Sequence, residues 1–215
     1  MKENKKYIWI SLVLLAMFAG WTALVCLIDV QPIGPNGSSV GFASLNRYVH
    51  EATGVNFTLY TITDWMGLLP IGVAFGFAVF GLTQWIKRKN VLKVDRNILV
   101  LGGFFLAVMA VFAFFETVVI NYRPVLIEGV LEASYPSSTT MLAMCVMPTA
   151  MLNLKFYLKG RGLRSLCSVL VWGFVGFMVI GRLLSGVHWL TDIIGGGIVS
   201  AGLVAMYVGV TDACS

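Results

Sequence analysis

Six long apolar stretches constrain the fold of this chain more than any other feature of its 215 residues. About 20 apolar residues in a helix are needed to cross the hydrocarbon layer of a bilayer. The chain is 58% hydrophobic and only 12% charged, whereas soluble domains are about 25% charged. The sequence therefore predicts one all-α domain over residues 1–215, a polytopic membrane bundle of six transmembrane helices. The six stretches cover roughly residues 7–28, 66–86, 97–120, 140–158, 165–186 and 189–210.

The distribution of Lys and Arg predicts the orientation of this bundle, because basic residues stay on the cytoplasmic side during insertion. If six spans alternate, only Arg47, Arg123 and Arg182 fall on the outer side. The protein is therefore expected to be a multi-pass protein of the cell membrane, with both termini in the cytoplasm. The net charge of +5 follows from this topology, and no motif indicates nucleic-acid binding. The other basic residues are Lys2, Lys5, Lys6, Lys87, Arg88, Lys89, Lys93, Arg96, Lys155, Lys159, Arg161 and Arg164.

The longest connection between spans covers residues 29–64 and is expected on the extracytoplasmic side. From Val40 to Thr53, the apolar residues Phe42, Leu45 and Val49 recur at helical spacing between polar residues. This pattern is typical of a short amphipathic helix that lies in the membrane interface.

Ionisable residues gather at the outer ends of the last four spans. Such groups cost roughly 2.5–3.5 kcal/mol at the middle of a membrane helix, so those retained usually face a cavity or a partner. His188 and Asp192 are four residues apart and share a face if both are helical. The pair is explained either by a helix-terminal hydrogen bond or by a carboxylate that fixes the imidazole tautomer and frees one nitrogen for catalysis. The five residues are Glu116, Arg123, Arg182, His188 and Asp192.

Two arginines near one histidine favour an oxyanion site, because guanidinium groups bind phosphate bidentately. The fourth span begins after Pro136 with Ser137, Ser138 and Thr139. This is an ordinary helix start, but it also aims free backbone N–H groups outward, which makes an anion seat.

No metal or other cofactor is expected from the sequence. The four cysteines have neither a metal-binding spacing nor the pattern of a disulfide framework. His188 and Asp192 alone offer too few ligands for a metal ion. The cysteines are Cys26, Cys145, Cys167 and Cys214.

The order and spacing of these residues resemble the type 2 phosphatidic acid phosphatase family of membrane lipid phosphatases. The motifs of that family can be written Lys-x(6)-Arg-Pro, Pro-Ser-Gly-His and Ser-Arg-x(5)-His-x(3)-Asp. The residues in register are Arg123 and Pro124 in the first motif, Pro136 and Ser137 in the second, and Arg182, His188 and Asp192 in the third.

The resemblance implies a phosphatase-like core over residues 97–210, with its site on the extracytoplasmic side. It implies that His188 attacks phosphorus and forms a phosphohistidine, and that Asp192 orients this nucleophile. The groups implied to bind phosphate are the side chains of Arg123, Arg182 and Ser137 and the backbone N–H groups of Ser138 and Thr139.

Four positions depart from the family pattern. Glu116 stands where the family has lysine, and a carboxylate repels phosphate unless it is protonated or paired. Thr139 stands where the family has the histidine that protonates the leaving group, and threonine cannot donate a proton near neutral pH. Ser138 replaces a glycine, and Gly181 replaces the serine before Arg182.

Three hypotheses follow from these departures. In the first, another group supplies the acid: Glu116, whose pKa would rise on desolvation, or His50. In the second, the departing group needs little protonation, as in a pyrophosphate. In the third, the site binds a phosphorylated lipid or is catalytically silent. Weaker acid candidates are Glu128, Glu132 and Tyr135.

Glu116 has a further interpretation, a salt bridge to Arg123 or Arg182 that stabilises the bundle. The function favoured by the sequence is hydrolysis of a phosphomonoester or pyrophosphate of a lipid. The alternative is a catalytically silent, headgroup-binding or lipid-translocating member of the same fold, and a phosphoryl or headgroup transferase is the third candidate. A phosphorylated lipid and the bilayer are the expected partners, and no feature predicts an oligomeric state.

Overall fold

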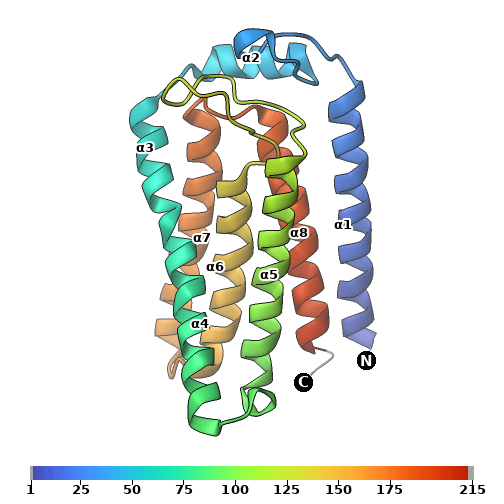
Figure 1. Ribbon diagram of the computed structural model, residues 1–215. Coiled ribbons are helices and arrows are strands. Elements are labelled where there is room, and N and C mark those ends of the chain that lie inside the picture. The colour runs from blue at the N-terminus through green and yellow to red at the C-terminus, as the bar shows by residue number, and fades with distance from the viewer. Residues whose placement is uncertain (1, 213–215) are drawn as a thin grey trace.

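The structure, a computed structural model, is a bundle of long helices and describes residues 2–212, so that Cys214 lies outside it. Figure 1 shows the long helices side by side, with α2 lying across one end. The all-α membrane bundle predicted from the sequence is confirmed. The helices are α1 (Lys2–Leu27), α2 (Ala43–Thr53), α3 (Phe57–Met66), α4 (Leu68–Arg88), α5 (Arg96–Thr117), α6 (Ser138–Tyr157), α7 (Arg161–Leu184) and α8 (Leu190–Asp212), with single 3-10 turns at Pro35–Gly37 and Val91–Lys93.

Five segments of the described chain are long and apolar enough to cross a membrane: α1, the joined α3 and α4, α5, α7 and α8. The sixth long helix, α6, packs against α4, α5, α7 and α8. Because other helices enclose it, α6 needs less apolar surface for lipid than the outer helices do. Its buried residues surround the helix and include Met141, Ala143, Cys145, Val146, Met147, Ala150 and Met151.

The long helices alternate in direction, so both ends of the chain lie at the same end of the bundle (Figure 1). The connections from α4 to α5 and from α6 to α7 lie at that end as well. These are the segments that carry the basic residues on which the predicted cytoplasmic orientation depends. The opposite end, which holds α2 and the connection from α5 to α6, is called the α2 end below.

Residues 57–66 differ from the sequence-based expectation, because they form helix α3 and not part of a loop. Asn56 caps this helix, since its side-chain oxygen accepts the N–H of Leu59 at 2.9 Å. Asparagine before an apolar run is a common helix start. With α4, this helix forms a 32-residue apolar segment from Phe57 to Arg88. At the α2 end, α3 packs against α7.

Helix α2 is tied to the first turn of α8 by a buried asparagine. The Nδ2 atom of Asn46 donates to the carbonyl of Gly41 at 2.8 Å and to Oγ1 of Thr191 at 3.0 Å. Its Oδ1 accepts the N–H of Thr191 at 3.2 Å. The buried face of α2 therefore carries the polar residue Asn46, whereas Leu45 and Tyr48 are exposed. Asn46 is buried because it accepts an N–H group that has no intrahelical acceptor at the start of α8.

Replacing Gly186 by alanine is expected to destabilise the α2 end. Gly186 lies in the turn from α7 to α8 with φ of 68°, and a Cβ there would lie 2.0 Å from the carbonyl oxygen of Gly54. We expect the free energy of unfolding to fall by about 1–3 kcal/mol, measured by thermal unfolding in detergent. Gly173→Ala on α7 is the matched control, because nothing lies within 4 Å of its Cβ position. Equal stability of the two variants would contradict this packing.

Candidate active site

Two arginines from different parts of the chain converge on one imidazole nitrogen at the α2 end. Nη1 of Arg123 lies 3.5 Å from Nε2 of His188, and Nη2 of Arg182 lies 3.4 Å from the same atom. Arg123 follows α5, Arg182 lies in the last turn of α7, and His188 lies just before α8. All three side chains are buried, so the two positive charges are held in place around one nitrogen.

This geometry assigns the tautomer of His188. A guanidinium group can only donate hydrogen bonds, so Nε2 is the acceptor and carries a lone pair. The ring proton of the neutral imidazole is then on Nδ1, which lies 3.7 Å from Oδ2 of Asp192. That distance is too long for a hydrogen bond but close enough for electrostatic attraction, and catalytic hydrogen bonds often tighten only when substrate binds.

Asp192 is completely buried and is held by two donors. Its Oδ1 accepts from Nδ2 of Asn121 at 3.2 Å, and its Oδ2 accepts the backbone N–H of Trp189 at 3.0 Å. The second contact is a capping interaction, in which an acidic residue in the first helical turn reaches back to the residue before the helix. Asn121 in turn accepts the N–H of Gly41 at 3.4 Å. The carboxylate that faces His188 therefore has little freedom to move.

The environment of His188 keeps its imidazole neutral. Burial lowers the pKa of His188 well below its ordinary value of 6.5, and the charges of Arg123 and Arg182 lower that pKa further. A protonated imidazole has no lone pair on Nε2 and cannot act as a nucleophile. The same two arginines that would bind a phosphate thus also keep the histidine in its nucleophilic form.

We expect the folded protein to lose stability as the pH falls from 7 to 5. The unfolded chain takes up a proton on His188 near pH 6.5 that the folded chain does not, so the free energy of unfolding decreases below that pH. Burial also lowers the pKa of His50, which acts in the same direction. The expected slope is at most about 1.4 kcal/mol per pH unit for each histidine.

Thermal unfolding in detergent at pH 5, 6 and 7 measures this slope. The His188→Gln variant should show a smaller slope than the wild type, and the His188→Gln/His50→Gln double variant a smaller one still. An unchanged slope in the double variant would mean that other groups cause the effect.

Both arginines have carboxylate partners that differ from the one considered in the sequence. Nε of Arg123 lies 2.9 Å from Oε2 of Glu132, although its N–H is not aimed at that oxygen. Nη1 of Arg182 lies 3.5 Å from Oδ1 of Asp64. Glu116 is exposed, and among the described residues its carboxylate makes no ion pair with either arginine. The expected salt bridge between Glu116 and an arginine is therefore not present in this structure.

Helix α3 forms the wall of the site next to Arg182. The hydroxyl of Thr63 accepts from Nη1 of Arg182 at 3.4 Å, and the Arg182 guanidinium lies over the ring of Tyr60, 5.1 Å from its centroid. Gly181 permits this approach, because a Cβ there would lie 2.7 Å from Cγ2 of Thr63. Glycine at position 181, where the resembled family has serine, thus allows α3 to pack closely against α7.

The segment between α5 and α6 folds back on itself over the site. The N–H of Arg123 donates to the carbonyl of Glu132 at 3.0 Å, and the N–H of Ser134 donates to that of Asn121 at 2.9 Å. Trp189 is anchored below this hairpin, since its Nε1 donates to the carbonyl of Tyr122 at 2.7 Å. The hairpin therefore fixes Arg123 and carries Glu132 to it.

The residues expected to form a phosphate seat at the start of α6 are partly engaged elsewhere. The N–H of Ser137 donates to the carbonyl of Asp192 at 3.1 Å, whereas its buried Oγ has no hydrogen-bond partner. Ser138 and Thr139 are the first two residues of α6, where backbone N–H groups have no intrahelical acceptor. The side chain of Thr139 points to the junction of α3 and α4, 3.3 Å from the Cβ position of Gly67.

His50, the other histidine considered as a proton donor, contacts the residue next to His188. Its ring lies 5.4 Å from that of Trp189, with an angle of 57° between the planes. The structure shows no hydrogen bond to its buried Nδ1 atom. His50 is thus at the correct end of the bundle, but no contact joins it to Arg123, Arg182 or His188.

Two cavities with carboxylates open beside the arginines. One, of about 510 Å³, is lined by residues that include Glu116, Arg123 and Glu132. The other, of about 330 Å³, is lined by residues that include Tyr60, Asp64 and Glu128. Neither is a metal site, since within residues 2–212 no group of three or more His, Cys, Asp or Glu side chains is placed to hold a metal ion.

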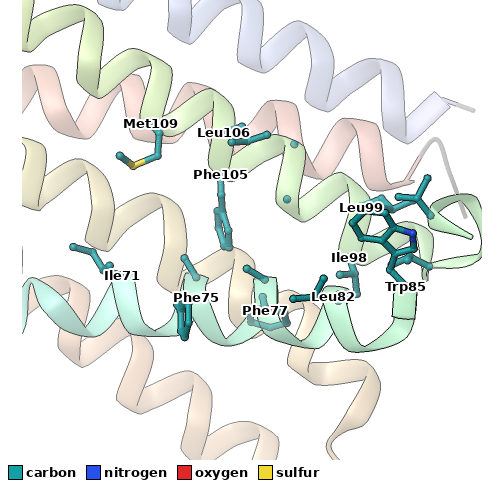
Figure 2. A pocket seen from close by; sticks show the side chains of 17 residues that line it. Ile71, Phe75, Phe77, Leu82, Trp85, Ile98, Leu99, Phe105, Leu106 and Met109 are labelled. Atoms are coloured by element: carbon teal, nitrogen blue, oxygen red, sulfur yellow. The ribbon is translucent and has the colours of Figure 1, made fainter. Parts of the chain in front are cut away.

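A different hollow lies between α4 and α5, away from these polar groups. Figure 2 shows side chains from both helices bordering it, among them Phe75, Leu82, Trp85, Phe105 and Met109. Its volume is about 670 Å³, and its lining is apolar. Such a surface suits the hydrocarbon of a lipid and has no group that binds phosphate.

Sequence reasoning missed the contributions of α3 and of Asn121. Tyr60 and Asp64 are four residues apart, a spacing that puts them on one face of a helix, and Asn56 gives a start signal for that helix. Asn121 stands two residues before Arg123, but no local pattern predicts its hydrogen bond to Asp192.

Comparisons with known proteins agree with this architecture. Residues 114–213 match the PAP2 superfamily. The fold resembles a crystal structure described as the first transmembrane PAP2 type phosphatidylglycerolphosphate phosphatase from Bacillus subtilis, with a TM-score of 0.52 and 19% sequence identity. That similarity covers 94% of this chain and 95% of the other. No curated protein sequence matches this chain significantly.

Proposed function

We propose that this membrane protein, whose residues 114–213 match the PAP2 superfamily, is a lipid phosphatase that works through a phosphohistidine at His188. One observation carries the proposal: the arginines at 3.5 and 3.4 Å point their donors at the lone pair of Nε2. A phosphoryl group bound by Arg123 and Arg182 would therefore lie directly in front of the nucleophile. This arrangement supplies both the positioning and the charge stabilisation on which phosphoryl transfer depends.

The first chemical step forms a bond between Nε2 and phosphorus. The Nε2 lone pair attacks, and the bond from phosphorus to the lipid oxygen breaks with its electron pair on that oxygen. The imidazole becomes positively charged, and its Nδ1–H turns to Asp192, whose negative charge stabilises it. In the second step, water attacks phosphorus, and the electron pair of the P–N bond returns to His188.

The proposed substrate is a phosphomonoester or pyrophosphate of a lipid, presented at the extracytoplasmic face. The lipid character follows from a site at the end of a membrane bundle, next to helices that face hydrocarbon. The basic residues, which concentrate at the end opposite to the proposed site, support the extracytoplasmic side. The phosphatidylglycerolphosphate of the Bacillus subtilis relative is therefore included among the substrates to be tested.

A second candidate function is binding or translocation of a phosphorylated lipid without hydrolysis. The observation that favours it is the pairing of Arg123 with Glu132 and of Arg182 with Asp64, together with Thr139 at the position of the family's acid. In this case lipid phosphates would bind, but phosphate would not be released.

The deciding experiment measures phosphate release by the purified protein in detergent. The panel contains phosphatidic acid, phosphatidylglycerol phosphate and a polyprenyl diphosphate, and binding of each lipid is measured in parallel. Release from at least one lipid supports the phosphatase. Binding without release from any of them would establish the second candidate, and neither binding nor release would contradict both.

A further inference from the structure

Gly67, just past the end of α3, lies near the start of α6, where the family's acid histidine would stand. A Cβ at Gly67 would lie 2.9 Å from the carbonyl oxygen of Asp64 and 3.3 Å from Cγ2 of Thr139. Thr139 holds the position of that histidine in the resemblance to the family. The methyl group of Thr139 therefore lies near Gly67, the residue just past the end of α3, three positions after Asp64.

The carboxylate of Asp64 also reaches the phosphate-binding groups. Its Oδ1 lies 3.5 Å from Nη1 of Arg182, while Nη2 of the same guanidinium lies 3.4 Å from Nε2 of His188. One guanidinium group thus separates the carboxylate from the nucleophile. A phosphoryl group held by Arg182 in front of His188 would be next to Asp64 as well. The side chain of Asp64 is 55% exposed, so water can reload its proton.

Each of the other acid candidates lacks either a position near Thr139 or an ion pair with Arg182. Glu132 pairs with Arg123 from the hairpin that follows α5, and no contact joins it to Thr139. Glu116 lines cavities beside Arg123 and Ser138, but it does not pair with Arg182. His50 packs on Trp189.

From this placement we propose that Asp64 is the proton donor that replaces the family's second-motif histidine, a role that rests on the phosphatase function proposed above. As the bond from phosphorus to the lipid oxygen breaks, the carboxylic acid of Asp64 gives its proton to that oxygen. The resulting carboxylate then takes a proton from the water that attacks the phosphohistidine. Asp64 is thereby protonated again, and the lipid alcohol and inorganic phosphate are the two products.

The test compares two leaving groups in the Asp64→Asn variant. The alcohol of phosphatidic acid needs a proton to depart, whereas the nitrophenolate of 4-nitrophenyl phosphate does not. We expect kcat on phosphatidic acid to fall at least about 100-fold, with little change in KM. The first-turnover burst of nitrophenolate should fall by less than about fivefold, and phosphorylated protein should accumulate because the water-activating base is missing.

Matched variants complete the design. Asp64→Glu should keep a large part of the activity, and Glu116→Gln and His50→Ala should leave the ratio between the two substrates unchanged. An equal fall in the first-turnover rate on both substrates in Asp64→Asn would overturn the proposal, because Asp64 would then only position Arg182. Full activity of Asp64→Asn on phosphatidic acid would overturn it too. A wild-type protein that releases nothing from either substrate would contradict the phosphatase function, and the role of Asp64 with it.

Discussion

The His188→Ala variant is expected to lose phosphate release from lipid phosphates by a factor on the order of 10⁴ or more. The loss should appear in kcat, because the variant cannot form the bond between nitrogen and phosphorus. Binding should change much less, since Arg123 and Arg182 remain. Without the imidazole between them, the two guanidinium groups are even free to bind a phosphate more tightly.

Rapid acid-free quenching with a ³²P-labelled lipid phosphate measures the intermediate directly. The wild type should carry the label on a histidine, with phosphorus on Nε2, because Nδ1 holds the proton that faces Asp192. His188→Ala should carry no label. His50→Ala is the matched control, since it removes the other histidine of the chain and should label normally. Label that persists in His188→Ala would place the nucleophile elsewhere.

The Arg182→Lys variant is expected to lower kcat/KM by about 10²–10³-fold, although it keeps the positive charge. The guanidinium of Arg182 contacts Asp64, Thr63 and His188 at the same time and lies over Tyr60. A lysine ammonium is a single point of charge and cannot hold this planar arrangement. Because the side chain is fully buried, no solvent can fill the place of the missing contacts.

Steady-state kinetics on a lipid phosphate, together with thermal unfolding, tests this prediction. Arg123→Lys should show a similar loss, since its guanidinium also points to Nε2 of His188. Arg47→Lys is the control, because Arg47 lies at the same end of the bundle on the exposed side of α2. Wild-type activity of Arg182→Lys in a folded protein would show that charge alone suffices at this position.

The candidate site combines a histidine faced by two arginines with carboxylates that pair with both arginines. Arg123 and Arg182 each face a carboxylate, and Glu116 stands where the family that the sequence resembles has lysine. A phosphate that binds here must displace or share the partners Glu132 and Asp64. We therefore expect Glu132 and Asp64, and not only His188, to affect whether the candidate site hydrolyses a phosphorylated lipid or only binds it.

The sequence alone determined the membrane bundle, because each helix in a bilayer must satisfy its own backbone hydrogen bonds and present apolar side chains to lipid. Hydropathy along the chain therefore predicts the spans one by one. Local spacing also predicted that His188 and Asp192 lie close together, although His188 precedes the first turn of α8. The positions of Lys and Arg predicted which loops share an end. Helix α6 shows the limit of this reasoning, since its neighbours and not lipid cover much of its surface.

Only the tertiary structure decided which charges meet. Thr63 and Arg182 are 119 positions apart, and Asn46 and Thr191 are 145 apart, so their contacts depend on how helices rotate and pack and not on any local pattern. The sequence predicted a connection over residues 29–64 where α3 stands, because the second apolar stretch was placed at residues 66–86. The sequence also suggested Glu116 as the partner of an arginine, because it lies close to Arg123 along the chain. The packing of the helices instead brings Asp64 to Arg182, and the hairpin brings Glu132 to Arg123.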